Sequence, residues 1–146
     1  MLLFKQLILL KMIKENDLRL NNLVMVNYKT DLLSKVTWIQ EGSINVTFDR
    51  QPDLINGVVC SVNDLIPIDL TTGYLLKLGF ELCEEFKKGV YGLFWFKHPL
   101  KIRTLKENIS VYFRGELIFF DIKYVHQLQN LYFALTGEEL VFSTEP

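Results

Sequence analysis

The feature that most constrains the fold of this chain is a succession of short segments in which apolar and polar residues alternate. The clearest pair covers residues 34–40 and 43–48, with Glu41 and Gly42 between them. Alternation with a period of two is typical of a strand with one buried face. Two such strands around a two-residue turn predict a β-hairpin.

The rest of the chain continues this pattern and adds two helices. A short helix is predicted after Thr71 or Thr72, either of which can cap it, and Gly79 ends it. A long helix is predicted over residues 124–135, ended by Gly137. Consecutive strands without a βαβ rhythm predict an α+β fold, an antiparallel sheet of hairpins covered by a short and a long helix. The other predicted strands are residues 23–28, 58–61, 65–68, 90–96, 100–105, 109–113, 117–121 and 139–142.

Two faces of the long helix differ in polarity. At 100° per residue, one stripe holds Tyr124, Leu128, Leu131 and Leu135, widened by Val125 and Tyr132, and we expect it to pack on the sheet. The opposite face carries His126, Gln129, Asn130 and Phe133. Two interpretations of this face stay open: another segment covers it, or it is an exposed contact surface.

Length and composition are those of one compact domain. The 146 residues are 49% hydrophobic and include 11 Phe, 6 Tyr and 2 Trp, which argues against intrinsic disorder. We predict a single domain over residues 12–146, preceded by an apolar extension over residues 1–11. This extension is too short to cross a bilayer, and its charges are misplaced for a signal peptide. Met12 is a second candidate start.

Reactive and cofactor-binding motifs are not recognisable in the sequence. Cys60 and Cys83 lack metal-ligand spacing, which predicts free thiols in a reducing compartment. The two histidines, His98 and His126, lie in no nucleophile motif, and no glycine-rich phosphate loop occurs. We therefore expect no enzymatic activity, no metal and no cofactor, and a function performed by surface contact with a macromolecule.

Three segments carry a resemblance to a known family. Residues 124–140 (YVHQLQNLYFALTGEEL) resemble the C-terminal signature of small prophage-borne proteins of Gram-negative bacteria. Residues 16–24 and 67–80 are similar to the family's start and middle, in the same order. The extra residues 1–11 and the aromatic stretch 89–106 depart from the family pattern.

The resemblance implies a phage accessory protein, without known enzymatic activity, that inhibits a host defence system by binding. One implied form is an anti-CRISPR protein acting on the type VI-B RNA-guided ribonuclease or on its guide-RNA loading. Its partner would be that effector or its ribonucleoprotein, in the cytoplasm of the bacterial host and not at a membrane. The alternative is an RNA-binding or self-associating structural or regulatory phage protein.

One local cluster of positive charge stands out from a net charge of -1. Basic residues crowd positions 97–106 without an acid, next to Phe94, Trp95 and Phe96. Such a cluster is ordinarily a solvated strand face beside core aromatics, and alternatively holds single-stranded RNA by phosphate contact and base stacking. With the polar face of the long helix, the predicted partner-binding residues are Lys97, Lys101, Arg103, Lys106, Arg114, His126, Gln129, Asn130 and Phe133.

Overall fold

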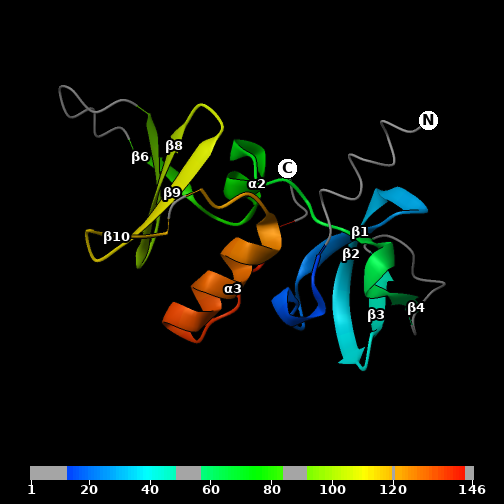
Figure 1. The fold of residues 1–146 in the computed structure, drawn as a ribbon. Helices are drawn as coiled ribbons and strands as arrows, with labels where there is room; N and C mark the ends of the chain where they lie inside the picture. Colours follow the sequence, from blue (N-terminus) through cyan, green and yellow to red (C-terminus); the bar gives the residue numbers. More distant parts are fainter. Residues whose placement is uncertain (1–12, 49–56, 84–91, 120, 144–146) are drawn as a thin grey trace. The chain divides into compact units, whose positions relative to one another are not determined.

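The computed structural model describes residues 13–48, 57–83, 92–119 and 121–143, and the predicted extension over residues 1–11 lies outside them. The chain divides into two compact units, Met1–Ile68 and Asp69–Pro146. Each unit has its own antiparallel sheet, and the second also has two helices (Figure 1). The α+β class is therefore confirmed, with two sheets. That residues 12–146 form a single domain stays a prediction.

The first unit is a five-stranded meander whose last strand returns to the first. Its sheet has the order β4-β3-β2-β1-β5, and all of its pairings are antiparallel. The predicted hairpin is confirmed, with positive φ at Glu41 (43°) and Gly42 (82°), the geometry of a tight primed turn. The strands are β1 (Leu23–Val26), β2 (Lys29–Gln40), β3 (Ser43–Phe48), β4 (Val58–Ser61) and β5 (Leu65–Ile66).

Alternation on β3 builds the core of the first unit. Ile44, Val46 and Phe48 are buried, and Val36 of β2 packs in the same cluster. A register shift lies between Val36 and Trp38, so Trp38 does not follow Val36 into the core and is exposed. A short 3-10 turn at Glu15–Asp17 precedes β1, and a second one at Val62–Asp64 connects β4 to β5. The second turn is capped by Ser61, whose hydroxyl accepts from the Asn63 amide.

Cys60 is a buried free thiol on β4, as predicted. Burial raises the pKa of this thiol above its ordinary value, and the Asp64 carboxylate adds to the rise. Because the thiolate is the reactive form, we expect iodoacetamide at pH 8 to alkylate Cys60 roughly tenfold or more slowly in the folded protein than in urea. Mass spectrometry of the two cysteine peptides measures this, and equal rates would contradict the burial of Cys60. The half-buried Cys83 supplies a comparison in the same sample.

The sheet of the second unit follows sequence order, β10-β9-β8-β7-β6. A tight turn joins the strands predicted over residues 109–113 and 117–121, with positive φ at Arg114 (52°) and Gly115 (88°). Strand β6 was not predicted, because its three residues are too few to show an alternation of apolar and polar side chains. The elements are α2 (Thr72–Lys77), β6 (Glu81–Cys83), β7 (Leu93–Lys97), β8 (Leu100–Leu105), β9 (Asn108–Phe113), β10 (Glu116–Phe119) and α3 (Val125–Thr136).

The strand predicted over residues 139–142 is not formed. Leu140 is buried, and the Phe142 ring lies 5.9 Å from the Tyr74 ring of α2. The Lys77 ammonium lies over the same Phe142 ring, and the Ser143 amide donates to the Lys77 carbonyl at 2.8 Å. The segment therefore docks on α2 through side chains and one backbone bond, and these contacts replace a strand ladder.

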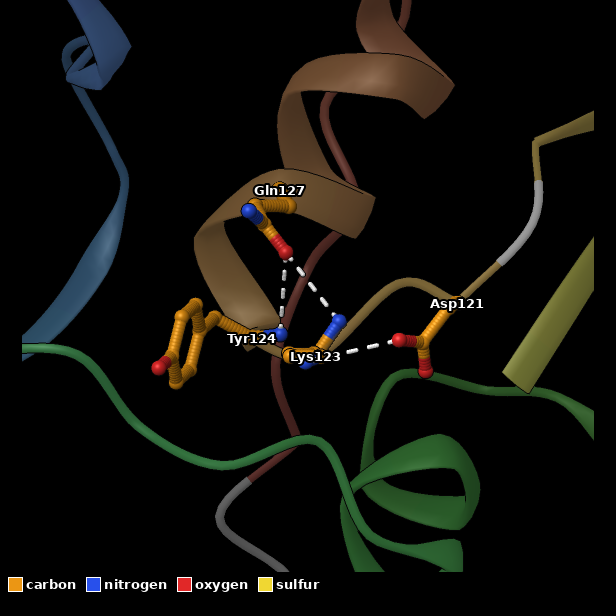
Figure 2. A network of polar contacts seen from close by, with 4 residues as sticks. All are labelled: Asp121, Lys123, Tyr124 and Gln127. Carbon is orange, nitrogen blue, oxygen red and sulfur yellow. Dashed lines mark hydrogen bonds and ion pairs between the residues drawn. The ribbon is translucent and has the colours of Figure 1, made fainter. Parts of the chain in front are cut away.

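Helix α3 begins and ends close to the predicted residues. Figure 2 shows its start, where the Gln127 carboxamide oxygen accepts from the Lys123 amide at 3.1 Å and the Tyr124 amide at 3.2 Å. Lys123 also forms an ion pair with Asp121 at 3.4 Å. These contacts satisfy two donors that precede the first helical turn. At the other end, Gly137 has φ 75°, the left-handed conformation that suits a terminating glycine.

Candidate partner-binding surface

The sheet of the second unit has one buried face. Trp95, Ile102 and Val111 are directly paired across β7, β8 and β9, and all three are buried. Helices α2 and α3 lie on this side (Figure 1). Two hydrogen bonds connect the helices to the end of β7 and the turn that follows it. The Tyr132 hydroxyl of α3 donates to the His98 carbonyl, and the Lys97 ammonium donates to the carbonyl of Leu78, the residue after α2.

The opposite face combines aromatic and basic side chains, because residues directly paired across antiparallel strands point to the same side. Phe94 is paired with Arg103, and Phe96 with Lys101, which is paired in turn with Tyr112. We call Phe94, Phe96, Lys101, Arg103 and Tyr112 the basic–aromatic face. Phe96 is 44% exposed, and the other four side chains are half-buried.

The charge of the basic–aromatic face is locally positive. The Lys101 ammonium lies 4.8 Å from the centre of the Phe94 ring, a cation–π contact that holds the charge over the sheet. Lys101 and Arg103 are two residues apart on β8, which places their Cα atoms about 6.6 Å apart. One carboxylate, that of Glu81, joins the same row through its pairing with Phe96 at the β6 edge.

Two further predicted basic residues lie in turns at opposite ends of these strands. Lys106 follows β8 in the β8–β9 turn and is exposed, with φ 53°. Arg114 opens the β9–β10 turn and is also exposed, and its guanidinium lies 5.1 Å from the centre of the Phe113 ring. Each cation has an exposed acid in or beside the same turn, Glu107 after Lys106 and Glu116 after Arg114.

Lys97 does not join this set. It is two residues from Trp95 on β7 and therefore shares the buried side of the strand. Its ammonium donates to the Leu78 carbonyl at 2.8 Å, next to the C-terminal end of α2. A cation at this position satisfies an unpaired helix carbonyl. The structure thus gives Lys97 a structural role, while the spacing in the sequence grouped it with the exposed cations.

The polar face of α3 is more enclosed than an open contact surface would be. His126 and Gln129 are buried, at 3% and 2% exposure, and Asn130 and Phe133 are half-buried. The His126 ring stacks on the Tyr124 ring, with centres 5.8 Å apart. Of the two interpretations of this face, the exposed contact surface does not hold for His126 and Gln129, which are covered. A helical angle identifies the most apolar face and cannot show that a second face is also covered.

The structure reveals one exposed apolar surface that was not predicted. It lies on β10, the edge strand that forms within the strand predicted over residues 117–121. Leu117, Ile118 and Phe119 are 52%, 38% and 44% exposed. A register shift between Leu117 and Phe119 puts them beside Tyr112 and Val111, on opposite faces. In the sequence, the four consecutive apolar residues 117–120 break the alternation of a half-buried strand, and this break was the available signal. We call Glu116–Phe119 the apolar edge strand.

Neither a cluster of metal ligands nor a membrane-spanning helix occurs in the part of the chain that the structure describes. Within residues 13–48, 57–83, 92–119 and 121–143, no group of three or more His, Cys, Asp or Glu residues is placed to hold a metal ion. No described helix is both long and apolar enough to cross a membrane.

Comparison of the sequence with protein-family models, with curated proteins and with solved structures finds no match in any of the three.

Proposed function

We propose that this chain is a prophage-borne accessory protein without catalytic activity that inhibits a host defence system by binding one of its components. The target proposed is the type VI-B RNA-guided ribonuclease or its ribonucleoprotein, in the cytoplasm of the host cell. The resemblance of residues 124–140, 67–80 and 16–24 to prophage proteins supports the biological setting. The apolar edge strand is the structural observation that carries the binding function.

An edge strand is a template for another chain. Its outer row of backbone N–H and C=O groups points away from the sheet and can pair with an added strand. Proteins normally protect such edges with lysine, proline or a covering segment. The apolar edge strand has only Glu116 as a charged residue, and its bulge adds twist without removing the three exposed apolar side chains. This combination favours a partner that supplies an extended apolar segment.

Co-purification tests the proposal. We expect the type VI-B effector and this protein to elute together from gel filtration at micromolar concentration. Charges introduced by Leu117→Lys and Ile118→Lys should weaken the complex by about tenfold or more, because the partner would have to remove the lysine ammonium groups from water. The matched control is Val59→Lys with Val141→Lys, at side chains 62% and 72% exposed and outside this strand, which should leave binding unchanged.

The outcomes separate the possible partners. Separate elution of the unaltered protein and the effector would eliminate this target. Elution of the protein alone at twice its monomer mass, reverting to one mass with Leu117→Lys, would assign the apolar edge strand to self-association. Equal weakening by the control substitutions would remove the edge strand from the contact.

A further inference from the structure

We propose that the basic–aromatic face binds a single-stranded nucleic acid. The face is formed by β7, β8 and β9, and Leu117 of the apolar edge strand borders it beside Tyr112. The contact proposed here uses the basic–aromatic face and not the edge strand, so this inference goes beyond the protein contact proposed above. It rests on the register that brings the five side chains of this face together, on their exposure, and on the charges of Lys101 and Arg103. All of these residues belong to the second unit.

The aromatic rings are arranged as a platform for bases. Phe94 and Phe96 are two residues apart on β7, about 6.6 Å along the strand, and point to the same side. Tyr112 shares the row of Phe96 and lies two strands away, about 10 Å across the sheet. Aromatic side chains on neighbouring strands of an open sheet face are how sheet-based RNA-binding domains stack successive bases. A duplex cannot use such rings, because its base faces are already stacked.

The basic side chains lie where a bound strand would place its phosphates. Lys101 and Arg103 occupy β8, between the strand of Phe94 and Phe96 and the strand of Tyr112. Lys106 and Arg114, in the turns, continue the line of cations toward both ends of the sheet. Stacking rings flanked by cations that follow the backbone characterise surfaces for single strands without sequence preference.

The overall net charge of -1 does not oppose this assignment. A protein that coats nucleic acid by charge alone is basic as a whole. Here Lys101 and Arg103 lie together on β8, and Glu81 is the acid in the row of Phe96, Lys101 and Tyr112. The predicted mode is therefore a short, stacking-dependent contact with a modest electrostatic component.

Fluorescence anisotropy with the full chain tests the inference. The probes are fluorescein-labelled oligouridine and oligothymidine of about 12 nucleotides, a length within the range of one single-strand binding domain. We expect saturable binding at low salt that weakens as salt rises. Preference for the uridine or the thymidine probe identifies RNA or DNA as the natural strand, and a duplex of the same length should bind more weakly.

Two variants separate charge from stacking. Lys101→Gln with Arg103→Gln should reduce the slope of log affinity against log salt by about 1.4, since each phosphate contact contributes about 0.7 for a single strand. Phe96→Ala should weaken binding about fivefold or more with the salt slope unchanged. The matched control, Lys14→Gln with Lys35→Gln, removes the same charge from exposed positions in the first unit and should bind like the unaltered protein.

The inference is overturned by any of three results. These are no binding of either probe at low salt, unchanged binding by both face variants, and an equal loss from the control pair. Circular dichroism of each variant confirms that the fold persists. Co-elution with the effector but no oligonucleotide binding would leave the proposed function standing and remove the nucleic-acid face, and the reverse pattern would do the opposite.

Discussion

Replacing Leu128 with alanine lowers the free energy of unfolding by about 2–5 kcal/mol. Leu128 is completely buried at the end of the first turn of α3, between the buried residues Val125 and Tyr132. The substitution removes apolar area from the interior and leaves a cavity that the surrounding side chains fill only in part. Urea denaturation followed by circular dichroism measures the change, which should appear as a lower midpoint with a similar slope.

Ala134→Gly on the same helix is a useful control for this measurement, because Ala134 is exposed. It should cost about 1 kcal/mol through helix propensity alone, without a cavity. A loss from Leu128→Ala no larger than the loss from Ala134→Gly would contradict the burial of Leu128.

The shape of the same transition tests the prediction of one domain over residues 12–146. If the two compact units unfold together, the whole curve of the Leu128→Ala variant should move to lower urea. If the units unfold separately, the curve should split, and only the part that reports on the second unit should move. The boundary between Ile68 and Asp69 would then be a true domain boundary.

Local elements were largely predictable from the sequence because their signals are local. Strand β8 occupies the predicted residues Leu100–Leu105, and α3 is shifted by one residue from the predicted 124–135. The turns at Glu41–Gly42 and Arg114–Gly115 each contain a glycine, the residue that adopts positive φ without a steric cost. The prediction of a strand over residues 139–142 was wrong, because the side chains of this segment pack on α2. The alternation of apolar and polar residues does not show whether a segment packs on a helix or pairs with a strand.

The candidate surface was only partly predictable because it depends on register. Alternation along β8 placed Lys101 and Arg103 on one side, as the structure has them. It could not show that Phe94 and Phe96 share that side, or that Tyr112, and not Phe113, lies beside Lys101. Lys97 was grouped with the exposed cations because the sequence does not reveal the helix carbonyl that it binds.

Gly57→Ala should destabilise the first unit by roughly 2–5 kcal/mol, through backbone strain together with overpacking. Gly57 directly precedes β4 and has φ 70°, in the left-handed region that L-residues rarely adopt. A methyl group there would also meet the Val46 carbonyl oxygen at 2.5 Å and the Asn45 side-chain oxygen. Since a backbone carbonyl in a paired strand cannot move freely, relief requires β4 to shift away from β3.

Gly42→Ala separates the two contributions. Gly42 also has positive φ, 82°, but nothing lies within 4 Å of the position its Cβ would occupy. Its replacement should therefore cost only the conformational strain, about 1–2 kcal/mol. Urea midpoints of the two variants, compared in the same buffer, give the difference directly. Equal losses would mean that β3 and β4 accommodate the methyl group without strain, and the close approach of Gly57 to Val46 would then not constrain the edge of this sheet.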